Sequence, residues 1–191
     1  LPSTSGKATV TSAIVSAYRF SRSIMLSFRS GNENLQIIPL PTHPLDFRSL
    51  GVYPLPGSKR NRGINLMGVL GRLARSYRLL KWRALAKISF FDTVLAGVQG
   101  KKMHLDLSDR VLSETLYVTG VWEKDVTTYL MQLLESGMVV IDIGANVGYY
   151  TLLAAEKVGG RGKVFAFEPE PSRYALLEKN VRANDLKNVI P

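Results

Sequence analysis

The sequence predicts an α/β fold with a doubly wound parallel sheet in the order βαβαβ, and two stretches carry this prediction. The first, "VVIDIGANVGYYT" from Val139 to Thr151, is a β-branched apolar run followed by an acidic residue and a glycine-containing loop. The second, "KVFAFEPEP" from Lys163 to Pro171, is another apolar run that ends in an acidic residue. Because parallel strands end at one edge of the sheet, the two acidic residues should border one ligand crevice.

The elements expected beyond Gly137 alternate between strand and helix. Strands are predicted over 138–143, over 163–168 and from 189, and helices over about 148–158 and 172–184. Strands that alternate with helices of this length form crossover units, so the strands should be parallel.

A helical and β-hairpin lead-in is predicted over 67–137. From 66 to 88, apolar residues recur on one helical stripe, with arginines and lysines around it. This stripe either packs on the domain or makes a basic amphipathic helix that contacts an anionic membrane surface. Two short strands around Gly100 and a helix over 122–136 should follow.

Residues 1–66 are predicted to be a largely unstructured leader. They hold ten serines and six of the nine prolines, without a sustained helical or strand period. The sequence begins with Leu1 rather than with methionine. Our hypothesis is that the natural protein begins at Met67 and that 1–66 is upstream read-through, with Met25 as the alternative start.

The basic charge is concentrated in one segment. Residues 47–91 carry ten basic and no acidic side chains, whereas 92–191 carry eleven basic and thirteen acidic ones. Such a segment is either a solvated helix face or a contact for anionic lipid, nucleic acid or acidic glycan.

Several classes of protein are disfavoured by composition. The sequence has no cysteine and two isolated histidines, His43 and His104, so we expect neither disulfides nor a metal site. No run of eighteen apolar residues is present, which argues against a spanning helix. We therefore expect a cytoplasmic location, with a membrane-peripheral one as the alternative.

The loop after the first predicted strand has the composition of a cofactor loop. Gly144 can adopt backbone angles closed to other residues, and the small Ala145 lets the loop pass close beneath a ligand. Asn146 is the non-glycine residue that best tolerates a left-handed conformation, and Gly148 allows a helix to begin close by.

The spacing of this loop distinguishes two kinds of cofactor. It reads G-x-N-x-G rather than the G-x-G-x-x-G of dinucleotide folds, which disfavours an NAD(P)-dependent oxidoreductase. Asp142 at the strand tip suits a ligand that bears positive charge. Glu168 suits the two hydroxyls of a ribose.

These motifs together resemble the FkbM family of S-adenosylmethionine-dependent methyltransferases, in the class I Rossmann-like superfamily. The resemblance is carried by "GVWEKD", "MVVIDIGANVGYYTLLAA", "GKVFAFEPEP" and "LLEKNVRANDLKNV". It covers roughly Thr119 to Pro191, and extends more loosely back to Met67. It implies that the chain holds the N-terminal part of a class I methyltransferase sheet, over 138–191, and that the family pattern continues beyond Pro191.

The resemblance also implies a cofactor, S-adenosyl-L-methionine, and a set of residues that bind it. The methionine and sulfonium end would lie against the loop, the ribose against Glu168, and the adenine beside Pro169. Glu123 occupies an acidic position that recurs ahead of the loop in the family. The expected cofactor-binding residues are Asp142, Gly144, Ala145, Asn146, Gly148, Glu168, Pro169 and Glu123. No catalytic residue is assigned.

The implied reaction is O-methylation of a hydroxyl group on a sugar or secondary metabolite. Its partner would be a small-molecule or glycan acceptor, and no nucleic acid is expected. A weak contact between 67–88 and an anionic membrane is retained as a further interaction. The rival from another class is a non-catalytic protein that binds an anionic membrane or nucleic acid through 47–91.

A last expectation concerns the edge of the predicted sheet. In class I sheets the strand at 138–143 is central, and its second neighbour would be encoded after Pro191. The backbone groups of "VVIDI" should therefore form an exposed apolar edge that pairs with other chains. We expect the 191-residue chain alone to associate and to lack methyl transfer.

Overall fold

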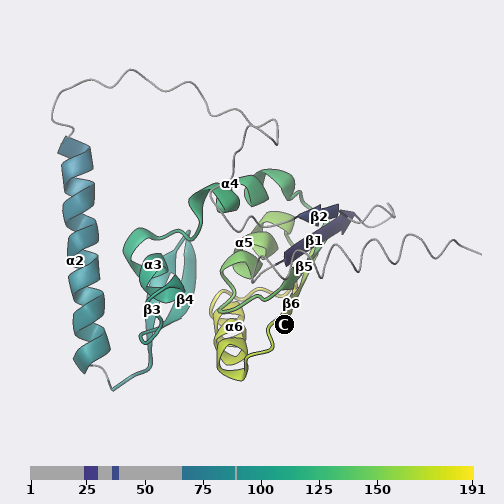
Figure 1. The fold of residues 1–191 in the computed structure, drawn as a ribbon. Coiled ribbons are helices and arrows are strands. Elements are labelled where there is room, and N and C mark those ends of the chain that lie inside the picture. The colour runs from purple at the N-terminus through teal and green to yellow at the C-terminus, as the bar shows by residue number, and fades with distance from the viewer. Residues whose placement is uncertain (1–23, 30–35, 39–65, 89) are drawn as a thin grey trace, which may run out of the picture.

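The computed structural model describes residues 24–29, 36–38, 66–88 and 90–191 (Figure 1). The strands are β1 Ile24–Arg29, β2 Gln36–Ile38, β3 Thr93–Val98, β4 Lys101–Asp106, β5 Met138–Ile143, β6 Lys163–Phe167 and β7 Val189–Ile190. The helices are α2 Leu66–Ile88, α3 Leu112–Thr119, α4 Lys124–Leu133, α5 Tyr149–Val158 and α6 Pro171–Ala183. One sheet has the order β2-β1-β5-β6-β7, and β3 and β4 form a separate hairpin.

The parallel part of the large sheet confirms the predicted βαβαβ unit. β5 pairs in parallel with β6, and β6 pairs in parallel with β7. Helices α5 and α6 make the two connections. The carboxyl ends of β5 and β6 therefore lie side by side, because Ile143 is in register with Phe167.

The far side of β5 is paired, and this corrects the expectation of an exposed edge. β1 runs antiparallel to β5 along its whole length, from Ile24 opposite Ile143 to Arg29 opposite Met138. Its sequence "IMLSFR" supplies apolar residues, and Met25 is fully buried. Pairing satisfies backbone groups of β5 that an open edge would leave to solvent.

The strands β1 and β2 also correct part of the predicted leader. We expected 1–66 to lack regular structure, yet 24–29 and 36–38 form an antiparallel pair within the sheet. The strand that pairs with β1 lies more than a hundred residues away along the sequence. Such long-range pairing produces no local hydrophobic period from which a strand could be predicted in a serine-rich segment. The remaining residues before Leu66 lie outside the described part of the chain. The structure therefore does not test the hypothesis that the protein begins at Met67.

The two faces of β5 differ in burial. Met138, Val140 and Asp142 are buried, whereas the alternating residues Val139 and Ile141 are only partly buried. Successive side chains of a strand point to opposite faces, so one face of the sheet carries the core. Figure 1 shows α5 and α6 on the same side of the strands β5 and β6. Asp142 thus points into the core side, beneath the start of α5.

The hairpin docks on the sheet domain through α6. Asn180 accepts a 2.6 Å hydrogen bond from the His104 amide and donates to the His104 carbonyl at 3.2 Å. One turn further along α6, Asn184 makes the same pair of bonds with Lys102, at 2.8 and 2.7 Å. The free edge of β4 is therefore paired with two asparagine side chains as it would be with a strand.

Helix α2 has the predicted bounds, but it packs through a different face. Trp82 is buried against Tyr117 of α3, with ring centroids 5.2 Å apart, and Leu85 packs beside it. The predicted stripe, which includes Leu73 and Leu80, is exposed. Trp82, the largest side chain of the helix, buries more apolar area than a leucine, which favours packing through its face. Within the described residues, no helix is both long enough and apolar enough to cross a membrane.

Candidate cofactor site

The loop between β5 and α5 is held in an unusual backbone conformation. The φ angles of Gly144, Asn146 and Gly148 are 80°, 52° and 91°, all in the left-handed region. Gly148 is required for a second reason, because a Cβ there would lie 2.7 Å from Cδ1 of Leu177 in α6. These residues turn the chain sharply from the strand into the helix.

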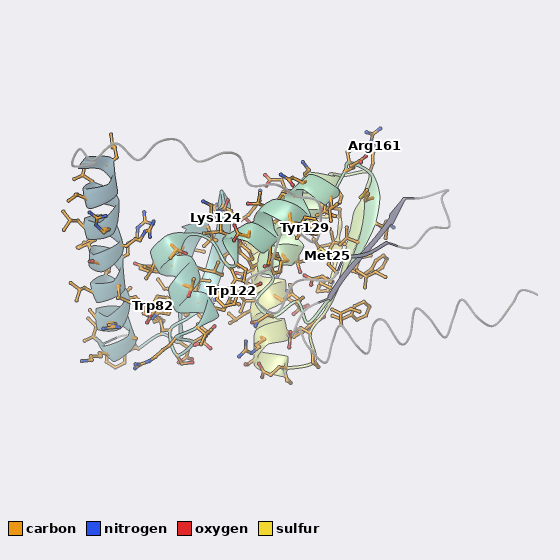
Figure 2. The ribbon with its side chains drawn as sticks, turned by 45° about the horizontal axis from the view of Figure 1, so that its top comes forward. Met25, Trp82, Trp122, Lys124, Tyr129 and Arg161 are labelled. Atoms are coloured by element: carbon orange, nitrogen blue, oxygen red, sulfur yellow. The ribbon has the colours of Figure 1, made fainter. Side chains whose placement is uncertain are left out.

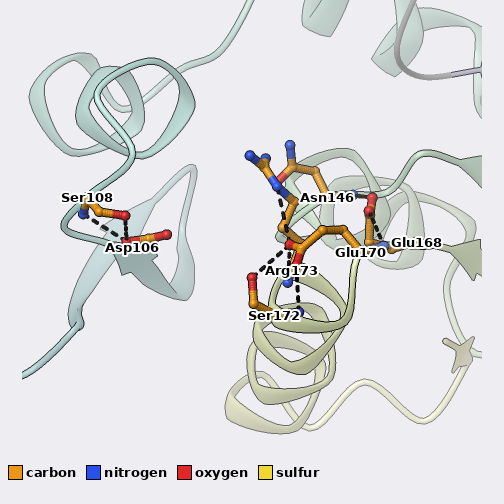
Figure 3. Close-up of polar contacts among 7 residues, drawn as sticks. All are labelled: Asp106, Ser108, Asn146, Glu168, Glu170, Ser172 and Arg173. Atoms are coloured by element: carbon orange, nitrogen blue, oxygen red, sulfur yellow. Dashed lines mark hydrogen bonds and ion pairs between the residues drawn. The ribbon is translucent and has the colours of Figure 1, made fainter.

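Hydrogen bonds fix this loop to the end of β6. The amides of Gly144 and Ala145 donate to the Phe167 carbonyl at 2.8 and 3.0 Å. The Asn146 amide donates to Oε2 of Glu168 at 2.8 Å, and the Glu170 amide donates to Oε1 at 3.0 Å (Figure 3). The half-buried Glu168 carboxylate therefore joins the two loops. A carboxylate has about four lone-pair positions, so it can still accept ligand hydroxyls.

Asp142 lies at the base of the loop and is fully buried. Its Oδ2 accepts a 2.6 Å hydrogen bond from the Thr151 hydroxyl, while Oδ1 has no hydrogen-bond partner among the described residues. The pKa of Asp142 is raised to about 6, mainly by burial and to a smaller extent by the charge of Glu168, while the hydrogen bond from Thr151 acts to lower it. A carboxylate with this environment favours a nearby positive charge.

A second buried acceptor belongs to Asn146. Its Oδ1 is buried and has no hydrogen-bond partner among the described residues. Buried polar atoms are seldom left unpaired, because desolvation without a new hydrogen bond costs free energy. Asp142 and Asn146 thus give the loop two acceptors suited to a cationic or hydrogen-donating group.

Glu123 lies at the start of α4 in a strained conformation. Its φ and ψ angles are 40° and 66°, which a non-glycine residue rarely adopts. Its Oε2 accepts a 2.9 Å hydrogen bond from the Tyr150 hydroxyl in α5. Burial, and next the charge of Glu123, raise the pKa of Tyr150, so this hydroxyl stays protonated as a donor. Glu123 is thereby tied to the first turn of α5, adjacent to the cofactor loop.

Two residues that support the loop were missed at the sequence level. Thr151 holds the Asp142 carboxylate, and the buried Asn180 donates a 2.8 Å hydrogen bond to the Val147 carbonyl. Thr151 could have been suspected, since it lies nine residues after Asp142 on the inward face of a predicted helix. Asn180 gave no signal, because asparagine in a helix usually faces solvent.

The remaining predicted residues fall at the edges of the site. Ala145 is a buried residue within the loop, and Pro169 is exposed directly after Glu168. The described residues contain no cluster of histidine or acidic side chains that could hold a metal ion.

Comparison with known proteins gives a family match for the part of the chain that holds this site. Residues 98–191 match the model of the TRM5/TYW2 methyltransferase domain. The matched stretch includes β4, the loop after β5 and the end of β6. Residues 98–191 are therefore similar to a class I, S-adenosylmethionine-dependent methyltransferase domain. The predicted enzyme class and cofactor are confirmed at this level.

Three curated relatives are similar in sequence to parts of this chain. The tRNA(Phe) (4-demethylwyosine(37)-C(7)) aminocarboxypropyltransferase of Methanocaldococcus jannaschii is 42% identical over 53 residues, 28% of this chain and 21% of that protein. The tRNA (adenine(58)-N(1))-methyltransferase TrmI of Thermus thermophilus is 35% identical over 78 residues, 40% of this chain and 31% of that protein. Methyltransferase sdnD of Sordaria araneosa is 38% identical over 52 residues, 27% of this chain and 20% of that protein.

The matches are shorter than the relatives themselves. The chain spans between 20% and 31% of the length of these proteins. The family model that matches is the TRM5/TYW2 domain rather than FkbM, so the finer family assignment gains no support from it.

The residues at the loop fit the cofactor of this domain. S-adenosylmethionine carries a positive sulfonium, an ammonium and a ribose diol. Asp142 and Asn146 provide buried acceptors, and Glu168 provides a carboxylate at the neighbouring strand end. When bound, the cofactor supplies an electrophilic methyl group, and the protein supplies alignment and charge.

Proposed function

We propose that this methyltransferase binds S-adenosylmethionine in the crevice between the loop 144–148 and Glu168. The observation that carries the proposal is a pair of buried oxygens, Asp142 Oδ1 and Asn146 Oδ1, that find no hydrogen-bond partner in the described part of the chain. They lie next to a carboxylate held by two backbone amides. In this arrangement Asp142 faces the cationic part of the cofactor and Glu168 accepts the ribose hydroxyls. Glu123 completes the mouth of the site from α4.

The proposed reaction is transfer of the methyl group to a hydroxyl of a sugar or secondary metabolite. The transfer is an in-line displacement, in which the carbon–sulfur bond breaks as the carbon–oxygen bond forms and the hydroxyl proton passes to a base. The FkbM resemblance supports this acceptor class. The chain's own contribution is to hold the cofactor in one orientation.

A second candidate acceptor is a tRNA nucleoside. Two of the relatives act on tRNA according to their names, and the matching family model is the TRM5/TYW2 domain. This alternative would replace the small-molecule acceptor and overturn the expectation that no nucleic acid is bound. The cofactor site is the same in both cases.

The cofactor part is tested by calorimetric titration of the full chain. We expect binding of S-adenosylmethionine and S-adenosylhomocysteine, and none of NAD⁺, because the loop lacks the pyrophosphate spacing. Binding of NAD⁺ alone would instead establish the oxidoreductase alternative.

The acceptor part is tested with methyl-labelled cofactor. Label incorporated into a small-molecule extract, and not into total tRNA, supports hydroxyl methylation. Label in tRNA that survives phenol extraction and is lost on ribonuclease treatment supports the second candidate.

A further inference from the structure

Helix α2 has two apolar faces, and only one of them is used by the fold. Trp82 and Leu85 pack toward α3, and Trp82 is 1% exposed. A second face, next to the first, carries a row of large apolar side chains that are between 51% and 74% exposed: Leu70, Leu73, Tyr77, Leu80 and Ile88. Their spacing of three, four, three and eight residues places them on one side of the helix.

The exposed row continues past the end of the helix. Phe90 and Phe91 are also exposed, directly after Ile88. Single exposed apolar residues are ordinary, but a contiguous row of this kind marks an interaction surface. In Figures 1 and 2 the helix lies at the edge of the molecule, and Figure 2 shows Trp82 on its inner side.

The charge of α2 has one sign. The helix contains six basic and no acidic side chains, and all six are exposed. Lys81 and Lys87 flank the apolar row, and Arg72, Arg75, Arg78 and Arg83 lie around the rest of the helix.

A cavity of about 370 Å³ opens between α2 and α3, near the C-terminal end of α2. It is lined by Trp82, by the cations Arg83, Lys87 and Arg110, and by Glu114. Three cations around one cavity suit an anionic group such as a phosphate. Two of these cations belong to α2, so the cavity extends the basic character of the helix toward the body of the protein.

These features together identify the occupant of the exposed face. Nucleic-acid interfaces are polar and rich in charge, so a row of exposed apolar side chains is not typical of them. A helix with an apolar face flanked only by arginine and lysine is typical of helices that lie in the interface of an anionic membrane. We propose that α2 binds anionic phospholipid, with the row from Leu70 to Ile88 in the boundary between headgroups and acyl chains.

In this orientation the membrane and the methyltransferase domain contact different faces of α2. Trp82 keeps the helix on α3, while the apolar row faces the lipid. The site at Glu168 stays on another part of the molecule, so cofactor binding should not depend on the lipid. The inference is independent of which acceptor the enzyme uses.

The test is flotation of the full chain with vesicles of phosphatidylglycerol and phosphatidylcholine, compared with phosphatidylcholine alone. We expect binding to the anionic vesicles only. The double variant Leu73→Gln/Leu80→Gln should lower the partition coefficient about tenfold or more, since two apolar side chains leave the interface. Glutamine preserves helix propensity, and circular dichroism checks that α2 persists.

Matched controls separate this face from apolar surface in general. Leu95 and Val111 are 55% and 65% exposed outside α2, so Leu95→Gln/Val111→Gln should bind vesicles as the unmodified chain does. Arg72→Gln/Arg75→Gln should weaken binding to anionic vesicles, whereas Arg161→Gln/Lys187→Gln should not.

Other occupants would give different results, each of which overturns the proposal. Unchanged flotation of the Leu73→Gln/Leu80→Gln variant would show that the row does not enter the lipid. Failure to bind anionic vesicles, with dimers in light scattering that this variant abolishes, would identify a second copy of the chain. Failure to bind vesicles, with binding of total RNA lost in Arg72→Gln/Arg75→Gln, would identify RNA.

Discussion

The amide of Asn146 donates a 2.8 Å hydrogen bond to Oε2 of Glu168, and this bond joins the loop after β5 to the end of β6. The two residues are twenty-two positions apart, yet each depends on the other. The left-handed conformation of Asn146 directs its amide toward the carboxylate, and the carboxylate holds that amide in place. Glu168 therefore has two roles, as a support of the loop and as an acceptor for the cofactor.

Replacement of Glu168 should weaken cofactor binding selectively. Glu168→Ala removes charge-assisted hydrogen bonds worth about 1.5–3 kcal/mol, so affinity for S-adenosylhomocysteine should fall roughly tenfold or more in a calorimetric titration. The neighbouring Glu170 is a matched control, because its carboxylate only accepts from Ser172 and Arg173 at the start of α6. Glu170→Ala should lower the melting temperature and preserve affinity. Equal affinities for the two variants would remove Glu168 from the site.

The buried Asp142 should make stability depend on pH. Its folded pKa, raised to about 6 from 3.8, means that the folded state binds the proton more tightly than the unfolded state. The stabilisation is full below pH 3.8 and is lost as pH rises toward 6, by about 3 kcal/mol in total. Asp142→Asn should therefore gain stability relative to the unmodified chain between pH 4 and pH 8. Urea unfolding of the variant and of the unmodified chain at pH 4 and pH 8 measures this difference. The prediction is contradicted if the free energies of unfolding of the two proteins change with pH in parallel.

Gly148 should tolerate no side chain. Gly148→Ala introduces a Cβ 2.7 Å from Leu177 at a φ of 91°, so we expect a loss of roughly 2–4 kcal/mol in the free energy of unfolding. Gly120 has a comparable φ of 75° with no atom within 4 Å of the added Cβ. Gly120→Ala should cost only about 1–2 kcal/mol, and thermal denaturation of both variants separates strain from overpacking. A smaller loss for Gly148→Ala would show that Leu177 moves aside.

Asn180 should couple the hairpin to the cofactor loop. Asn180→Leu removes its bonds to His104 and Val147 and leaves buried backbone groups unpaired, at a cost of roughly 2–4 kcal/mol. Hydrogen exchange should become faster at the His104 amide, with a smaller effect on β6. Asn184→Leu, at the more exposed pair with Lys102, should cost less. The same cost for both would show that the bond to Val147 contributes nothing.

Local sequence patterns predicted the part of the fold that local physics determines. The strand at 138–143 and the loop with Gly144 and Asn146 were predicted from an apolar run and from backbone preferences, and both are present. The pairing of β1 with β5 could not be predicted, because it joins segments more than a hundred residues apart. The sequence left open whether the apolar stripe of α2 packs on the domain or contacts a membrane surface. The period of the helix allowed either face to pack, and Trp82 favours one of them through its contact with Tyr117.

The supporting residues of the site escaped prediction on physical grounds. Thr151 and Asn180 act through single hydrogen bonds that depend on how α5 and α6 lie against the loop. Glu168 was expected to serve the ligand alone, and its bonds to two backbone amides depend on the turn that follows β6.

The most direct measurement of the central claim is an amide NMR titration of the full chain with S-adenosylhomocysteine. If the crevice binds the cofactor, the largest shifts should occur at 144–148 and at Glu168 and Glu170, and they should saturate together. Saturable shifts confined to other parts of the chain, such as the cavity beside Trp82, or no shifts at millimolar ligand, would contradict it.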